Sequence, residues 1–246
     1  MRARLLRRVE IGDGFVGGFT ATCGGVSREP WASLNLGSHV GDDPKDVGAN
    51  RDRLSRELGS PVAYMNQVHS NTVAAVTDRF PTGEVGTADA LITHRGGCAV
   101  AVLVADCVPV LLAAPATGHA AAVHAGRAGM LSGVIAAAVG QLRSGGSDLI
   151  LAAVGPHICG RCYEVPPDLR SAVCEAEPAA FATTRWNSAG LDIGAAVQAQ
   201  LRRLDVRIVA VDPACTYEHD DLYSYRRSCH EGSGVTGRFA GVIVSK

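Results

Sequence analysis

Two reactive side chains lie close together in an unusually apolar part of the sequence. Cys107 and His124 fall within ADCVPVLLAAPATGHAAAVHAGRAGM, residues 105–130, where few other side chains could do chemistry. Pro109 interrupts the apolar run after Cys107, and Gly126 follows His124, so both residues are expected at strand ends, where open sheets tend to place ligand sites. Either residue alone is more often part of a core, because a free thiol behaves as a small hydrophobe.

His69 is the candidate third partner. It lies in the polar cluster MNQVHSNTV, directly before an apolar stretch. Imidazole and thiolate are ligands that Zn²⁺ accepts, and a catalytic zinc site keeps one further position for water. Copper is the alternative metal. The long spacings between His69, Cys107 and His124 do not by themselves decide between a shared site and three unrelated residues.

The composition indicates a globular protein with a sizeable core. The chain has 246 residues, of which 47% are hydrophobic and 19% charged, with a net charge of −1 and 5% aromatic residues. A nucleic-acid-binding role is therefore not expected, since there is neither a basic field for phosphates nor a supply of aromatic rings for bases. The start, MRARLLRRVEIGDG, has no apolar segment typical of a secretory signal, so a cytoplasmic location is expected, with the eight cysteines as thiols or metal ligands.

The most apolar stretch, residues 98–115, contains Asp106 and Pro109 near its middle. It is therefore interpreted as two buried strands rather than a membrane helix. Further short apolar runs, bounded by Gly, Pro or Asp, predict strands at 72–78, 119–126, 149–155, 207–213 and 239–245. Helices are predicted at 43–59, with Asp43 as cap and Gly59 as stop, and at 129–146, 166–181 and 192–204.

Strands occur both consecutively and separated by helices, which favours a mixed sheet in an α+β or mixed α/β fold. No repeat, low-complexity tract or linker interrupts the chain. We therefore predict one domain over residues 1–246.

Several segments in fixed order resemble one family. They are LNLGSHVGDD, NQVHSNTV, TADALIT, ADCVPVLL, VHAGRAG, VGPHICGRCYEV, YSYRR and TGR, from about residue 14 to 243. This is similar to the multicopper polyphenol oxidase or laccase-domain family, described as zinc-dependent purine nucleoside phosphorylases. The resemblance implies that His69, Cys107 and His124 form one metal site and are the catalytic residues. It also implies a four-layer α/β/β/α architecture with mixed sheets.

Two segments depart from the family pattern. The usual HAGWRG is here HAGRAG, which lacks the tryptophan and shifts the arginine by one position, to Arg127. The usual TGRQ is here TGRF, ending at Phe239. The ligands survive both changes, but the substrate contacts of these segments are open, and a one-residue shift is expected to aim Arg127 elsewhere.

The remaining candidates carry weaker signals. Cys159 and Cys162 have CxxC spacing without a second pair, so a separate metal or redox role is the less favoured interpretation. Asp89 and Asp106 are expected to be buried; Asp106, adjacent to Cys107, is expected on the opposite face as a structural hydrogen-bonding residue. Six histidines are expected at the surface or behind the ligands: His39, His94, His119, His157, His219 and His230.

The resemblance implies a zinc-dependent purine nucleoside phosphorylase that acts on adenosine, inosine and S-methyl-5′-thioadenosine. Phosphate attacks the anomeric carbon and the free base leaves, giving ribose 1-phosphate. Adenosine deaminase activity is also expected, because a metal site with an open position can activate water for attack at C6. Arg51 is predicted to contact the phosphate, since the guanidinium fork suits phosphate oxygens, and Asn35 to contact the sugar.

Three alternatives are open. Cys107 as nucleophile with His124 as base would make a hydrolase of amide bonds, for instance in peptidoglycan precursors. A copper phenol oxidase (laccase) is ranked lower, because one cysteine and two histidines are too few for a multicopper centre. A non-enzymatic metal-binding protein is the last. The expected partners are small-molecule purine nucleosides and phosphate, with no nucleic acid or membrane and with a monomer or weak homo-oligomer.

Overall fold

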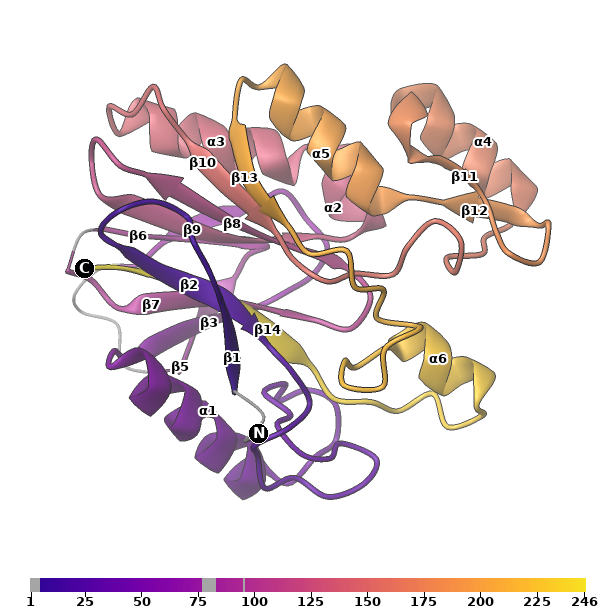
Figure 1. The fold of residues 1–246 in the computed structure, drawn as a ribbon, viewed down its shortest axis with the longest axis horizontal. Coiled ribbons are helices and arrows are strands. Elements are labelled where there is room, and N and C mark those ends of the chain that lie inside the picture. Colours follow the sequence, from indigo (N-terminus) through magenta and orange to yellow (C-terminus); the bar gives the residue numbers. More distant parts are fainter. Residues whose placement is uncertain (1–4, 77–82, 95) are drawn as a thin grey trace.

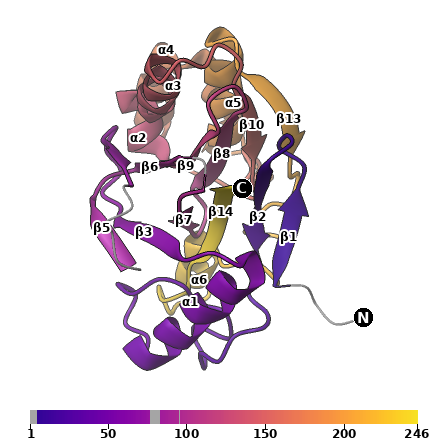
Figure 2. The same cartoon turned by 90° about the vertical axis from the view of Figure 1, so that its left-hand side faces the viewer.

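Two six-stranded sheets pack face to face, and helices cover both outer faces (Figure 1; Figure 2). The computed structural model describes residues 5–76, 83–94 and 96–246. The layers follow the order α/β/β/α, so the predicted mixed α/β fold with four layers is confirmed.

The first sheet is mixed. Its strand order is β1-β2-β14-β7-β3-β5. The pairs β7–β3 and β3–β5 are parallel, and the other pairs are antiparallel. The strands are β1 (Leu6–Val9), β2 (Phe15–Thr20), β14 (Phe239–Ser245), β7 (Ala99–Val104), β3 (Val62–Asn66) and β5 (Gly83–Thr87).

The second sheet is also mixed, with strand order β13-β10-β8-β9-β6-β4. The pairs β13–β10 and β4–β6 are parallel and the others antiparallel. The strands are β13 (Arg207–Val211), β10 (Leu151–Val154), β8 (Val108–Ala114), β9 (His119–Ala125), β6 (Ala90–Thr93) and β4 (Val73–Ala75). The end of the predicted 72–78 strand, beyond residue 76, lies outside the described residues.

Three apolar cores separate the four layers. One lies between the sheets and includes Phe19, Leu91, Leu111 and Phe239. A second lies between the second sheet and the helices α2, α3 and α5, and a third lies between the first sheet and α1. Strands such as β7 and β8 contact a core on each face, which explains why they are apolar throughout rather than alternating.

Helices α1 and α5 begin and end where the local sequence predicts. The Asp43 carboxylate caps helix α1 (Pro44–Leu58) by accepting a hydrogen bond from the backbone N–H of Lys45. Pro44 occupies the first helical position. It ends at Gly59, whose φ of 65° is left-handed. Helix α5 (Ile193–Arg203) is capped in the same way by Asp192. The other helices are α2 (Arg127–Ser132), α3 (Val134–Ser144), α4 (Pro167–Ala176) and α6 (Tyr225–His230).

Two predicted helices are divided. The 129–146 segment forms α2 and α3, because Gly133 between them has a φ of 88°. The 166–181 segment forms only α4, followed by a 3₁₀ turn at Pro178–Ala180 and strand β11 (Phe181–Thr183), which pairs with β12 (Ala189–Leu191). Pro178 prevents α4 from continuing through this point.

The chain crosses between the two sheets at three places that matter for the site. Residues 67–72 connect β3 to β4, residues 88–89 connect β5 to β6, and residues 105–107 connect β7 to β8. Each connection leaves the first sheet and enters the second. His69, Asp89 and Cys107 lie on these three connections.

Two exposed or half-exposed glycines provide a matched test of the α2–α3 break. A Cβ at Gly133 or at Gly140 would have open space around it, but only Gly133 has a positive φ. Gly133→Ala should lower the free energy of unfolding by about 1–2 kcal/mol. Gly140→Ala, inside α3, should raise it by about 0.5–1 kcal/mol, because alanine loses less entropy in a helix. Urea denaturation of both variants tests the assignment, and a stability gain in Gly133→Ala would contradict it.

Candidate metal centre

His69, Cys107 and His124 converge at one edge of the sheet sandwich. Their donor atoms all lie within 4.8 Å of one another, and Cys107 Sγ is 3.8 Å from His69 Nε2. The two imidazole rings meet edge to face with centroids 4.7 Å apart. The structure therefore places the three sequence-predicted ligands together.

Strand register explains the meeting of Cys107 and His124. Strands β8 and β9 are antiparallel, with Val108 opposite Ala125 and Pro109 opposite His124. Cys107, one residue before Val108, thus lies beside the end of β9. His69 arrives from the β3–β4 connection, in which its own φ of 60° reverses the chain.

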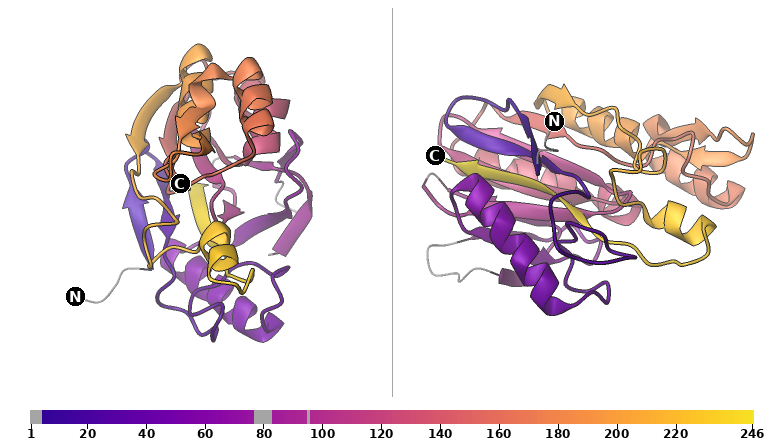
Figure 3. Two further views of the ribbon diagram at one scale, coloured as in Figure 1. Left: turned by 90° about the vertical axis from the view of Figure 1, so that its right-hand side faces the viewer. Right: turned by 60° about the horizontal axis from the view of Figure 1, so that its bottom comes forward.

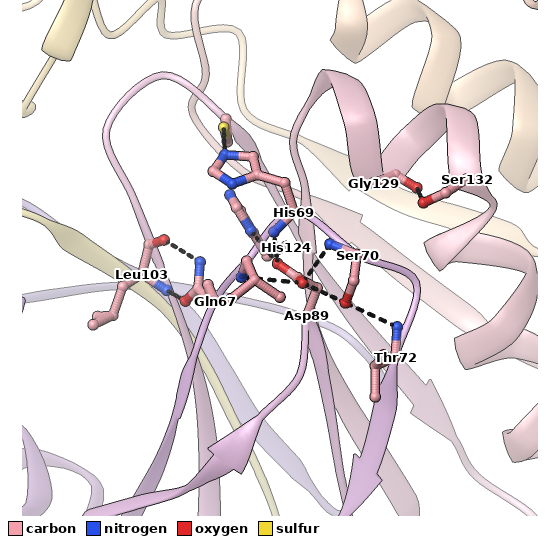
Figure 4. Close-up of polar contacts among 11 residues, drawn as sticks. Gln67, His69, Ser70, Thr72, Asp89, Leu103, His124, Gly129 and Ser132 are labelled. Atoms are coloured by element: carbon pink, nitrogen blue, oxygen red, sulfur yellow. Dashed lines mark hydrogen bonds and ion pairs between the residues drawn. The ribbon is translucent and has the colours of Figure 1, made fainter.

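The buried Asp89 carboxylate organises the cluster (Figure 4). It accepts from the backbone N–H groups of Val68, His69 and Ser70 at 3.3, 2.9 and 2.6 Å, and from the Ser70 hydroxyl at 2.8 Å. Its Oδ1 also lies 2.8 Å from His124 Nδ1. With Nδ1 engaged in this way, His124 is left with Nε2 for a metal, the arrangement that carboxylates commonly impose on histidine ligands.

Gly126 leaves the room that the ligands need. A Cβ at this position would lie 2.6 Å from His69 Cδ2 and 3.0 Å from Cys107 Sγ. Any larger residue would displace the imidazole or the thiol. The glycine after His124 therefore has a steric reason at the site.

The charges of the metal-free cluster favour a thiolate. Burial opposes charge on Cys107, but His124, and then His69, lower the pKa of its thiol to about 6 through attraction and hydrogen bonding. Burial likewise opposes charge on His124, yet Cys107 and Asp89 raise its pKa to about 9. Burial opposes charge on Asp89 as well, but hydrogen bonds from His124 and Ser70 outweigh this effect and hold the pKa of the carboxyl well below its usual range. A thiolate and two imidazoles form a donor set suited to zinc or copper.

The three ligands line a pocket of about 420 Å³. Apolar and aromatic residues form much of its wall, among them Leu103, Ile158, Tyr163 and Tyr225. This is a size and character usual for small-molecule sites. The candidate metal-binding cluster forms part of the same wall.

Polar residues at the pocket were only partly anticipated. Arg238 lines it and keeps its guanidinium near the backbone carbonyls of Thr236 and Gly237, at 3.0 and 2.9 Å. Burial lowers the pKa of Arg238. His39 also lines the pocket, and burial, followed by Arg238, lowers its pKa. His39 lies in LNLGSHVGDD and Arg238 in TGR, two of the segments that resemble the family. The resemblance pointed to these segments, but nothing in the sequence distinguished these two residues within them.

The two predicted substrate contacts have other partners. Asn35 is fully buried, and its Oδ1 accepts from the backbone N–H of Arg238 and of Gly37 at 2.9 Å each. Arg51 donates from Nε to the Leu36 carbonyl at 2.9 Å, and its guanidinium lies over the Tyr64 ring at 4.1 Å. Neither residue lines the pocket.

The departures in HAGRAG and TGRF have separate consequences. Arg127 lines the pocket at the start of α2, so the one-residue shift does not remove this arginine from the wall. Phe239 is fully buried in the core between the sheets, where it cannot contact a substrate.

Asp106 makes structural hydrogen bonds, as expected, but it is half-buried rather than buried and lines the same pocket as Cys107 rather than facing the opposite side. It does not lie on a strand; its φ is 99°, in the connection between β7 and β8. Its carboxylate accepts from Thr216 Oγ1, Ser224 Oγ and the backbone N–H of Arg226, each at 2.6 Å. It thus fastens the segment before α6 beside the pocket.

Of the other histidines, His157 bonds the Gly155 carbonyl at 2.8 Å and packs against Gly194. The His230 imidazole meets the Tyr217 hydroxyl at 3.0 Å. The Cys159–Cys162 motif forms a second cluster with Cys215 and Glu218.

No helix in the part of the chain that the structure describes is long and apolar enough to cross a membrane.

A sandwich of this kind, with a His-Cys-His cluster beside a small-molecule pocket, defines a candidate metalloenzyme. A sequence model of the family described as Multi-copper polyphenol oxidoreductase laccase matches residues 16–246. The chain belongs to this family.

Relatives of the chain carry a different name from that of the family. It is 49% identical over 231 residues to a purine nucleoside phosphorylase of Streptomyces coelicolor, covering 92% of this chain and 93% of the relative. It is 46% identical over 231 residues to one of Corynebacterium glutamicum, covering 92% of each. Since these relatives are named as phosphorylases, they support an enzyme.

Solved structures share the fold over nearly the whole chain. A Neisseria meningitidis protein superimposes with a TM-score of 0.86 at 32% identity, covering 99% of this chain and 100% of that one. YlmD from Geobacillus stearothermophilus gives a TM-score of 0.82 at 32% identity, covering 95% and 93%. The four-layer architecture is thus common to these proteins.

The first test of the site concerns Asp89. Asp89→Asn should weaken zinc binding roughly 10–100-fold, because the partner that orients His124 and the His69 backbone is changed. Competition with a chromogenic chelator measures the affinity. Asp42→Asn is the matched control, since Asp42 is also a buried carboxylate but bonds Asn35 instead. Equal affinity in wild type and Asp89→Asn would refute this role for the carboxylate.

A second test uses the lowered pKa of Cys107. After treatment of the protein with a chelator, the rate at which Cys107 is alkylated should increase with pH with a midpoint of about 6, because the neighbouring imidazoles favour the thiolate. Added zinc should suppress the reaction by occupying the sulfur. Peptide mass spectrometry after timed iodoacetamide treatment follows this residue among the eight cysteines. A midpoint near that of an ordinary thiol, or no protection by zinc, would contradict the arrangement.

Proposed function

We propose that the protein is a zinc-dependent purine nucleoside phosphorylase. The observation that carries the proposal is the placement of the His69–Cys107–His124 cluster at one side of a pocket that also contains Arg238. The names of the relatives at 43–49% identity support the same activity. Inosine, adenosine and S-methyl-5′-thioadenosine are the proposed nucleosides.

The proposed reaction exchanges one bond at the sugar. A phosphate oxygen bonds to the anomeric carbon while the bond from that carbon to N9 breaks, and the base leaves with the electron pair and takes up a proton. The products are the free base and the sugar 1-phosphate, which is ribose 1-phosphate from inosine or adenosine and 5-methylthioribose 1-phosphate from S-methyl-5′-thioadenosine. Such a site must hold an anion and stabilise positive charge on the sugar in the transition state.

The chain's own residues divide these tasks. Arg238 is proposed to hold the phosphate, since a guanidinium fork donates two hydrogen bonds to phosphate oxygens. Asn35 is proposed as a positioning residue, because it fixes the backbone of Arg238. Tyr163 and Tyr225 offer aromatic faces for the purine. Arg51 is retained as the competing candidate for the phosphate.

The metal ligands have a defined part. His69, Cys107 and His124 would hold the ion, and Asp89 would keep His124 in the required tautomer. A bound zinc ion supplies Lewis acidity at neutral pH. Adenosine deamination, in which water adds at C6 and ammonia leaves, is proposed as a second activity of the same pocket.

One observation favours a second candidate function. The site also resembles that of a cysteine hydrolase, in which a carboxylate orients an imidazole beside a thiol. Here the thiol is that of Cys107, the imidazole that of His124 and the carboxylate that of Asp89. A second imidazole, that of His69, 3.8 Å from the same sulfur, supports the metal site instead. Turnover that survives complete removal of metal would favour the hydrolase, and turnover lost on chelation and restored by zinc would favour the phosphorylase.

The function is tested by incubating the protein with inosine and varying phosphate. Hypoxanthine should form only with phosphate, as measured by chromatography. Arg238→Ala should raise the apparent KM for phosphate roughly 10–100-fold, the loss expected for a hydrogen bond to a charged group. Arg51→Ala is the matched arginine control and should leave this KM nearly unchanged. The reverse pattern would assign the phosphate to Arg51, and no release of hypoxanthine in metal-loaded protein would overturn the function.

A further inference from the structure

A second group of metal-binding side chains lies outside the pocket's lining residues. The donor atoms of Cys159, Cys162, Cys215 and Glu218 all lie within 4.8 Å of one another. Two of the thiols, those of Cys162 and Cys215, are buried, whereas Glu218 is exposed. Three thiols and a carboxylate, closed on one side by protein, are a donor set that Zn²⁺ accepts.

The CxxC turn presents its two sulfurs on the same side. The backbone N–H groups of Cys162 and Tyr163 both donate to the Cys159 carbonyl, at 2.9 and 3.0 Å. Cys159 Sγ and Cys162 Sγ are 3.6 Å apart. This is close to the roughly 3.8 Å that separates two sulfurs bound tetrahedrally to one zinc at about 2.3 Å each. It is far longer than a disulfide bond of about 2.05 Å.

Cys215 comes from another part of the chain and is held beside this turn. The backbone N–H of Cys159 donates to Cys215 Sγ at 3.3 Å. The two segments also pair through their backbones: His157 N donates to the Ala214 carbonyl at 3.3 Å, and Thr216 N to the His157 carbonyl at 3.1 Å. The third sulfur is therefore fixed by the fold and does not depend on a flexible side chain alone.

Arg185 compensates the negative charge that such a site would have. Its guanidinium donates to Cys162 Sγ at 2.6 Å and forms an ion pair with Glu218. Three thiolates and a carboxylate around one divalent ion would carry a net charge of about −2. A cation that bonds both a sulfur and the carboxylate fits the role of an outer partner of the ligands.

We infer that Cys159, Cys162, Cys215 and Glu218 bind a second Zn²⁺ ion, with a structural role. The ion would join the segment after β10 to the segment before α6, which pair through the backbone of His157 with Ala214 and Thr216. Ile158 and Tyr163 of the first segment line the pocket. The second segment leads into α6, the yellow helix in Figure 3, whose first residue, Tyr225, lines the pocket too. The second ion would thus fix this wall without touching the substrate. This inference does not rest on the proposed function.

The experiment separates the two sites by counting zinc in purified, reduced protein. Wild type should contain two zinc ions per chain, Cys107→Ala one, Cys215→Ala one, and the double variant none. Cys23→Ala, which removes a cysteine outside both clusters, should retain two. A single zinc in wild type that is lost in Cys107→Ala would overturn the second site.

Cobalt spectroscopy tests the site without altering it, so the result does not depend on whether Cys215→Ala folds. Co²⁺ added to metal-free Cys107→Ala should give the sulfur-to-cobalt charge-transfer band and the visible bands of a tetrahedral ion. Glu218→Gln in that background should raise the Kd for Co²⁺ roughly tenfold or more, because one anionic ligand is lost. An unchanged Kd would overturn the assignment of Glu218. Absence of the bands, or a Cys159–Cys162 disulfide in the reduced preparation, would overturn the site itself.

Discussion

The Asp89 carboxylate joins parts of the site that come from three different places in the chain. The carboxylate accepts hydrogen bonds from the backbone around His69 and from the His124 ring. The backbone carbonyl of Asp89 also accepts from the backbone N–H of His124, at 2.7 Å. A buried carboxylate is costly unless its lone pairs are satisfied. Here the hydrogen bonds that satisfy it are the same ones that place the ligands, so burial of the charge and formation of the cluster depend on each other.

The sandwich architecture makes this possible because the chain repeatedly leaves one sheet and enters the other. His69, Asp89 and Cys107 each lie on such a connection, and the β8–β9 register brings His124 to the same edge. The Gln67 side chain extends the β3–β7 pairing, exchanging bonds of 2.8 Å with the backbone of Leu103 (Figure 4). His69 and Asp106 on these connections have positive φ, whereas strands such as β7 and β8, which support the connections, are packed between two cores.

The pocket wall combines two kinds of polar group. The His69–Cys107–His124 cluster offers thiolate and imidazole donors, and Arg238, whose backbone is held by the buried Asn35, offers a guanidinium. A family described by copper chemistry and relatives named as phosphorylases are compatible with one scaffold, since function depends on the residues of the site rather than on the fold. One cysteine and two histidines suit a single metal ion.

Local sequence predicted the apolar strands β7 to β10, β13 and β14 and the limits of α1 and α5. Apolar runs identify such strands, and Asp43, Asp192 and Gly59 act through nearest neighbours. The short strands β1, β2, β3, β5 and β6 and the pair β11–β12 were not predicted. The candidate metal site was recognised because the motifs around His69, Cys107 and His124 resemble a family, not because of their spacing. Tertiary structure decided the rest. Only the β6–β9 pairing brings Asp89 to His124, and only the pairing of two distant segments adds Cys215 to the CxxC turn. Only the fold separates Arg51 from the pocket that Arg238 lines. Such contacts depend on strand order and register across the whole chain, which no short stretch of sequence specifies.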